Sequence, residues 1–189
     1  MKLLVIVDAQ NDFITGSLAN PEAQAAIPRM VKRIGELSQD TLVLFTKDTH
    51  YDNYLETEEG KNLPVKHCIY MTEGWSIHDA VSAAVKKGNF ASWNTSEIIN
   101  SRILKETFGS VKLAELIRSL DGVEEVLFMG FCTDICVVSN VLLVKAYCPE
   151  LKITVDASCC AGVTPQKHKA ALETMKSCQI QVIGEEVSE

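Results

Sequence analysis

Short apolar runs and longer amphipathic stretches alternate along the chain. The apolar runs lack polar alternation, which is typical of parallel strands covered on both faces. They predict strands at residues 3–7, 41–46, 125–129, 151–155 and 180–183, with a weaker one at 101–104. The amphipathic stretches predict helices at 21–38, 77–87, 111–120, 135–146 and 164–177. This alternation predicts a doubly wound α/β fold.

Polar and reactive residues follow four of the predicted strands. Asp8 ends the first strand, Asp48 the second and Lys105 the third, and the segment 130–136 follows the fourth. One charged residue after a strand is usually a solvated loop residue. Because ligands of such folds bind at the carboxyl ends of the strands, several such residues favour a functional site there. The irregular segment 48–76 is long, and long loops often carry function.

Composition narrows the class of protein. At 189 residues, with 47% apolar and 23% charged residues, the chain is expected to form one soluble domain over residues 1–189. A net charge of −7 argues against nucleic-acid binding. No apolar stretch approaches the length of a membrane span, and the opening residues lack the features of a signal peptide. We therefore expect a cytoplasmic protein that binds neither nucleic acid nor membrane.

The seven cysteines form no metal-binding spacing, and most are expected to be buried free thiols. Cys136 is the candidate nucleophile, because the first turn of the helix expected after the fourth strand favours a thiolate. Thr133 or Asp134 is expected to cap that helix, and backbone amides of the turn can form an oxyanion hole. The side chain of Cys132 is better explained as a small residue in a tight bend.

A cysteine nucleophile needs a base, and no histidine is obviously placed to serve Cys136. Asp8 can take the thiol proton, and Lys105 can stabilise the resulting thiolate.

The loop after the second strand carries a candidate metal site. Asp48, His50, His67 and a glutamate form a mixed nitrogen and oxygen set that suits Zn²⁺, Mn²⁺ or Fe²⁺. The alternative is a polar loop with two incidental histidines.

Five motifs occur in order: VDAQNDF (7–13), TKDTH (46–50), LPVKHC (63–68), ILK (103–105) and GFCTDICV (130–137). Together they resemble the isochorismatase-like cysteine hydrolases, in particular the nicotinamidase branch, over residues 3 to 183. The resemblance implies a Rossmann-like three-layer fold with a six-stranded parallel sheet. It also implies Asp8 as base and later acid, Cys136 as nucleophile and Lys105 as their electrostatic partner.

Further site residues follow from the same resemblance. A cis peptide is expected before Cys132, with the backbone amides of Cys132 and Cys136 forming the oxyanion hole. One divalent ion is expected on Asp48, His50, His67 and a fourth ligand, with Zn²⁺ ahead of Mn²⁺ and Fe²⁺. Since no histidine lies between His50 and His67, the fourth ligand must be a glutamate. Glu59 is the first choice, Glu56 the second, and Glu58 is a further candidate.

The metal set favours an amide on an aromatic nitrogen ring, and Phe13 is either a ring-stacking wall or a core aromatic. The predicted reaction is hydrolysis of nicotinamide to nicotinate and ammonia through an acyl-enzyme on Cys136. Two alternatives are a related hydrolase of another small amide and a non-catalytic interaction module. Asp8, Lys105 and Cys136 occurring together argue against the module. Members of this family are often oligomers, and the sequence does not fix the number of copies.

Overall fold

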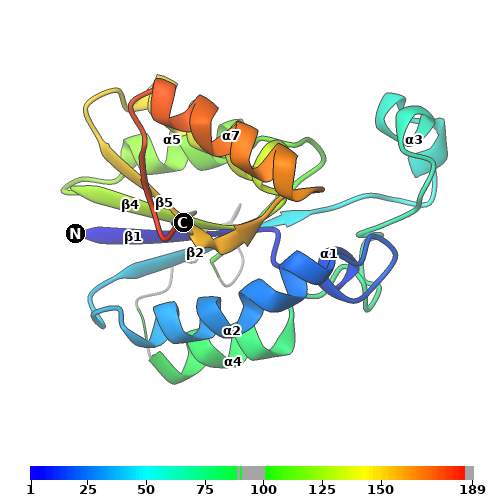
Figure 1. Ribbon diagram of the computed structural model, residues 1–189, viewed down its shortest axis with the longest axis horizontal. Helices are drawn as coiled ribbons and strands as arrows, with labels where there is room; N and C mark the ends of the chain where they lie inside the picture. Colours follow the sequence, from blue (N-terminus) through cyan, green and yellow to red (C-terminus); the bar gives the residue numbers. More distant parts are fainter. Residues whose placement is uncertain (89, 91–100, 186–189) are drawn as a thin grey trace.

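Six parallel strands form one sheet in the computed structural model, which describes residues 1–88, 90 and 101–185 (Figure 1). The strands are β1 (Lys2–Val7), β2 (Leu42–Asp48), β3 (Arg102–Lys105), β4 (Glu125–Phe131), β5 (Lys152–Ala161) and β6 (Gln181–Ile183). Their order is β3-β2-β1-β4-β5-β6, and each neighbouring pair is parallel. The predicted α/β fold with a six-stranded parallel sheet is confirmed.

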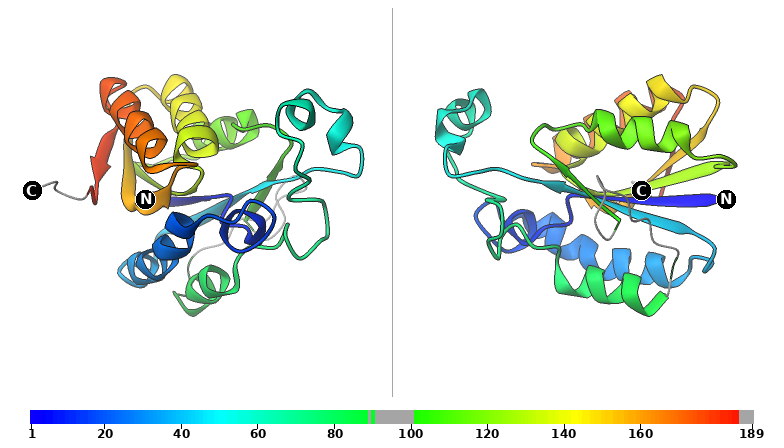
Figure 2. Two further views of the ribbon diagram at one scale, coloured as in Figure 1. Left: turned by 45° about the vertical axis from the view of Figure 1, so that its right-hand side comes forward. Right: turned by 180° about the vertical axis from the view of Figure 1, so that it is seen from behind.

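Helices cover both faces of the sheet, which gives the three layers expected. On one face, α2 (Pro21–Gly35) packs against α4 (Asp79–Gly88) (Figures 1 and 2). On the other, α6 (Val138–Tyr147) contacts both α5 (Val111–Ser119) and α7 (Pro165–Ser177). Four short turns complete the described elements: α1 (Asn11–Ile14), η1 (Tyr54–Glu56), α3 (Glu58–Asn62) and the π-helical η2 (Thr133–Val137). In the described part of the chain, no helix has both the length and the apolar character needed to cross a membrane.

The core lies in the central strands. All seven residues of β2, and all of β1 except Lys2, are buried. Burying each large aliphatic side chain there contributes about 1.5–3 kcal/mol to folding. The absence of polar alternation in these strands therefore reflects burial from both sides.

Element ends differ from the expectations at several places. β2 and β4 each run two residues beyond their predicted ends, and α2 stops at Gly35, short of residue 38. β5 continues to Ala161, because its pairing with β4 resumes after an irregularity between Phe128 and Gly130. The polar residues Asp156 and Ser158 conceal this continuation in the sequence.

Strand register brings the predicted site residues to one edge. Val7 lies beside Thr46 in β2 and Gly130 in β4, and Asp48 lies directly beside Lys105 in β3. The strand order reverses between β1 and β4, which is where ligands bind in such sheets. Gly130 has φ of 133°, and a Cβ there would lie 2.0 Å from the Val7 carbonyl oxygen. Only glycine permits this close approach of the two strands.

Candidate active site and metal-binding cluster

Asp8, Lys105 and Cys136 meet at the carboxyl edge of the sheet. Lys105 Nζ lies 2.6 Å from Asp8 Oδ2 and donates a hydrogen bond to Cys136 Sγ at 3.6 Å. The side chains of Asp8 and Lys105 are almost fully buried, with 0% and 1% of their surface exposed. Thr46 fixes the second carboxylate oxygen, because its hydroxyl donates to Asp8 Oδ1 at 2.7 Å. The three residues predicted from separate strand ends are thus one connected group.

The electrostatics of this group follow from burial around one positive charge. Burial raises the pKa of the Cys136 thiol well above its ordinary value, and the Lys105 ammonium offsets this only in part. Burial also raises the pKa of Asp8 against the opposing effect of Lys105. For Lys105, burial favours the neutral form, but Asp8, Cys136 and Asp48 outweigh it and hold its pKa well above the ordinary value. The sequence predicts that a helix start favours the thiolate, and burial of the turn opposes that effect.

The turn that carries Cys136 differs from the expected helix start. It is the π-helical η2, and neither Thr133 nor Asp134 caps it. Their side chains instead contact residues later in the chain: Thr133 Oγ1 lies 2.8 Å from His168 Nδ1, and Asp134 Oδ1 accepts from the amide of Val163 at 2.9 Å. The capping prediction was therefore wrong, because both side chains tie the turn to α7 and the segment before it. The Phe131–Cys132 peptide is cis, as the resemblance implied.

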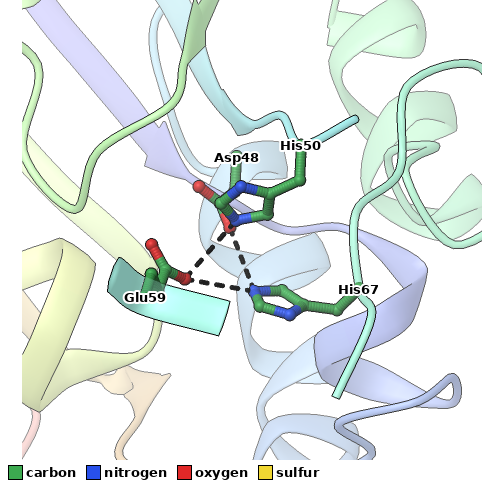
Figure 3. A group of neighbouring side chains, drawn as sticks. All are labelled: Asp48, His50, Glu59 and His67. Atoms are coloured by element: carbon green, nitrogen blue, oxygen red, sulfur yellow. Dashed lines mark hydrogen bonds and ion pairs between the residues drawn. The ribbon is translucent and has the colours of Figure 1, made fainter. Parts of the chain in front are cut away.

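A group of four potential metal ligands lies beside the catalytic candidates (Figure 3). Asp48, His50, Glu59 and His67 each offer one ligand atom, and these atoms lie within 4.8 Å of one another. His50 Nε2 lies 3.0 Å from Asp48 Oδ2 and 3.4 Å from Glu59 Oε1. His67 Nε2 lies 3.4 Å and 3.6 Å from the same two oxygens. The two imidazoles and two carboxylates converge on one point, so the donor set fits a divalent ion.

The structure brings Glu59, and neither of the other two candidate glutamates, into this group. Glu58 is exposed and pairs with Lys61. Thr57 starts α3 by accepting from the amide of Gly60 with its side chain, so that Glu59 lies in the first turn of this short helix. In Figure 3 the α3 ribbon carries Glu59 toward the two imidazoles.

Neighbouring groups orient the candidate ligands. His67 Nδ1 lies 2.8 Å from the Val65 carbonyl oxygen, a contact that requires the proton on Nδ1 and leaves Nε2 as a donor to metal. Burial alone would lower the pKa of His50, but hydrogen bonds to Asp48 and Glu59 raise it to about 9. Burial would raise the pKa of Asp48, yet Lys105 and the two histidines lower it. The carboxylates of Asp48 and Glu59 thus favour a positive charge beside them, and a divalent ion would supply such a charge.

Cys136 and the four potential metal ligands line one cavity of about 1310 Å³. Its wall includes Asp48, His50, Glu59, His67, Cys132, Cys136 and Phe13. Phe13 is only 6% exposed and meets the ring of His67 edge-on at 5.7 Å between centroids. It is thus both a core aromatic and part of the cavity wall.

Two supporting residues were missed in the sequence. Gln10 accepts from the amide of Asp48 at 2.7 Å and donates to its carbonyl at 2.8 Å, which fixes the strand end that carries this carboxylate. Asp12 accepts from the amide of Cys68 at 2.7 Å, beside His67. Both residues lie within the VDAQNDF motif, and the polar positions of this motif could have indicated them.

Comparisons with known proteins find relatives along nearly the whole chain. The nicotinamidase/pyrazinamidase of Mycobacterium tuberculosis is 27% identical, over 97% of this chain and 98% of that protein. The crystal structure of a nicotinamidase from Bacillus subtilis aligns with a TM-score of 0.73 at 25% identity, covering 96% of this chain and 98% of that one. The pyrazinamidase of Pyrococcus horikoshii in complex with zinc has a TM-score of 0.70 at 24% identity, over 96% and 98% of the two chains, and shows the fold alone.

The model of the isochorismatase domain matches residues 2–187, which is nearly the whole chain. The family resemblance predicted from five short motifs is therefore confirmed, and this chain belongs to the isochorismatase family.

Proposed function

We propose that this protein is a cysteine-dependent amidohydrolase that converts nicotinamide and water to nicotinate and ammonia. One observation carries the proposal: Asp8, Lys105 and Cys136 form a buried connected group, and Cys136 lines the same cavity as the cluster of Asp48, His50, Glu59 and His67. The relatives named as nicotinamidases or pyrazinamidases support the amide class of substrate.

In the proposed reaction, Cys136 Sγ attacks the carboxamide carbon as Asp8 takes the thiol proton. This order follows from the raised pKa of the thiol, which makes a free thiolate costly before substrate arrives. The backbone amides of Cys132 and Cys136 hold the oxyanion, and Lys105 offsets the negative charge. Asp8 then returns the proton to the leaving nitrogen, and ammonia departs from a thioester on Cys136. Water, deprotonated by Asp8, attacks the thioester carbon, and nicotinate leaves as the thiol is restored.

The four-residue cluster is proposed to bind one divalent ion, with Zn²⁺ as first candidate. When bound, such an ion would supply open coordination positions that anchor the pyridine nitrogen and a water molecule. His50 and His67 would donate through Nε2, and Asp48 and Glu59 through carboxylate oxygens. Asp48 has a second role, because its Oδ1 accepts from Lys105 Nζ at 3.1 Å. The ligand that faces the ion therefore also holds the catalytic lysine.

The size of the cavity supports keeping one alternative. At about 1310 Å³ it exceeds the roughly 300–1,000 Å³ of an ordinary small-molecule site, and it is larger than one pyridine ring needs. A larger aromatic amide would use this space. Phe13, beside His67, would pack against the aromatic ring in either case.

The deciding experiment is release of ammonia from nicotinamide by the purified protein, with nicotinate measured in parallel. We expect turnover by the wild type and none by Cys136→Ala, with fold and metal content unchanged. Cys132→Ala is the matched control, since only the backbone amide of Cys132 takes part, and it should retain activity. Wild-type turnover by Cys136→Ala would remove this residue from the mechanism. Turnover of larger amides in place of nicotinamide would favour the alternative substrate.

A further inference from the structure

Asn140 is a fully buried polar residue one helical turn after Cys136. Its side-chain amide donates to the Cys136 carbonyl oxygen at 2.7 Å and to the Phe108 carbonyl oxygen at 3.1 Å. Its side-chain oxygen accepts from the Ser110 amide at 2.9 Å. Both amide hydrogens and the oxygen of this side chain are thus engaged.

These three bonds join two segments that are far apart in the sequence. One is the turn that carries Cys136. The other lies between β3, which ends at Lys105, and α5, which Ser110 caps through a bond from the Leu113 amide to its hydroxyl. Asn140 therefore connects the nucleophile to the segment that begins directly after its lysine partner.

The segment after Lys105 is weakly anchored by its own side chains. Residues 106–108 are exposed, and Phe108 itself is 45% exposed, so its side chain does not anchor the segment in the core. Val141 and Val144 of α6 are fully buried, so apolar packing already holds this helix in place. Its position therefore does not depend on the side-chain amide of Asn140. A buried amide costs free energy unless all its groups are bonded, and here each is bonded to one of the two segments.

We propose that Asn140 is a positioning residue that holds Cys136 in register with Lys105. The inference rests on the proposed function, because the distance it maintains is that of the reacting thiol from its lysine partner, 3.6 Å. Asn140 acts through the Cys136 carbonyl and the 108–110 backbone. A small displacement of either segment would separate the two groups.

Two substitutions test the role. Asn140→Ala removes all three bonds, and Asn140→Asp keeps the size of the side chain and the bond from Ser110 but loses both donors. We expect kcat to fall by about tenfold or more in both variants, because misplacement by about 1 Å can cost roughly 100-fold. KM should change by less than about threefold, since Asn140 is not among the residues that line the cavity. If Asn140→Ala does not fold, the Asp variant carries the test.

Val144→Ala is the matched control, because it removes buried methyl groups from the same helix and leaves the three hydrogen bonds of Asn140 in place. It should lower the melting temperature and leave kcat at the wild-type value. If Asn140 were only structural, its variants would likewise lose stability and keep kcat per folded molecule. That result would overturn the proposal.

A second readout does not depend on the substrate. The rate of Cys136 alkylation by iodoacetamide at pH 7.5, followed by peptide mass spectrometry, should fall in both Asn140 variants and stay constant in Val144→Ala. An unchanged or faster rate in the Asn140 variants would contradict the positioning role. Failure of the wild type to hydrolyse nicotinamide would refute the proposed function, and the alkylation rates would still decide the role of Asn140.

Discussion

At the scale of single residues, the site is defined by one ammonium and three acidic groups. Lys105 contacts Asp8, Asp48 and Cys136, and all four residues are buried. A single positive charge cannot balance three negative ones in a site with little water. Burial and the two carboxylates therefore disfavour the thiolate. In the proposed mechanism, Asp8 accepts the thiol proton as Sγ forms a bond to the substrate.

The role of Lys105 can be measured on the free enzyme. The Lys105 ammonium opposes the effect of burial on the thiol, so Lys105→Ala should raise the pKa of Cys136 still further. Alkylation of Cys136 at a given pH below that pKa should then slow, by about tenfold for each unit of the rise. Iodoacetamide labelling of this cysteine from pH 6 to 10 gives the profile. Lys112→Ala, an exposed lysine on α5, is the control, and a Lys105→Ala profile that matches it would leave Lys105 without an electrostatic role.

At the scale of elements, the ends of β1, β2 and β3 could be located to within two residues, because the apolar runs stop at or near charged residues. That is why Asp8, Asp48 and Lys105 could be assigned to one edge of the sheet from the sequence. The π-helical form of η2 could not be predicted, since the residues 133–137 are equally compatible with an ordinary helix start. Glu59 could be separated from Glu56 and Glu58 only by resemblance, because the short helix α3 that turns it toward His50 has no periodic pattern of its own.

The contact between α7 and η2 predicts a pH effect on stability. Burial lowers the pKa of His168 below its ordinary value, and the weaker effects of Asp134 and Glu185 oppose this. As pH falls through about 6.5, the unfolded chain gains a proton at this histidine before the folded chain does. The folded state therefore loses stability until the pH reaches the lower pKa of the folded chain.

His168→Gln removes that proton but keeps a side chain able to bond to Thr133. Its free energy of unfolding, measured in urea, should decline less between pH 7.5 and 5.5 than that of the wild type. Lys169→Gln, an exposed change on the same helix, should decline as the wild type does. Parallel declines in wild type and His168→Gln would show that the Thr133 contact does not depend on the protonation of His168.

At the scale of the whole molecule, the sheet brings together the candidate metal cluster and the group of Asp8, Lys105 and Cys136, which come from separate motifs of the sequence. The register of β2 and β3 sets Asp48 beside Lys105, so one carboxylate belongs to the candidate metal cluster and also contacts the lysine of the proposed catalytic group. That sharing depends on pairing between distant strands and could not be predicted from either motif alone. That the chain forms one domain over residues 1–189, lies in the cytoplasm and assembles into oligomers stays a prediction.

The metal cluster gives the last prediction. We expect one divalent ion per chain by elemental analysis, and a melting temperature that rises when Zn²⁺ is returned to chelator-treated protein, because the ion binds the folded state. Glu59→Gln should lower metal content and the rise in melting temperature, whereas Glu58→Gln changes an exposed residue paired with Lys61 and should do neither. Metal removal should raise KM more than it lowers kcat, because in the proposed mechanism Cys136 attacks and the ion only anchors the substrate. Full-rate hydrolysis of nicotinamide by metal-free protein would disprove that anchoring role, and equal metal loss in both glutamate variants would disprove the assignment of Glu59.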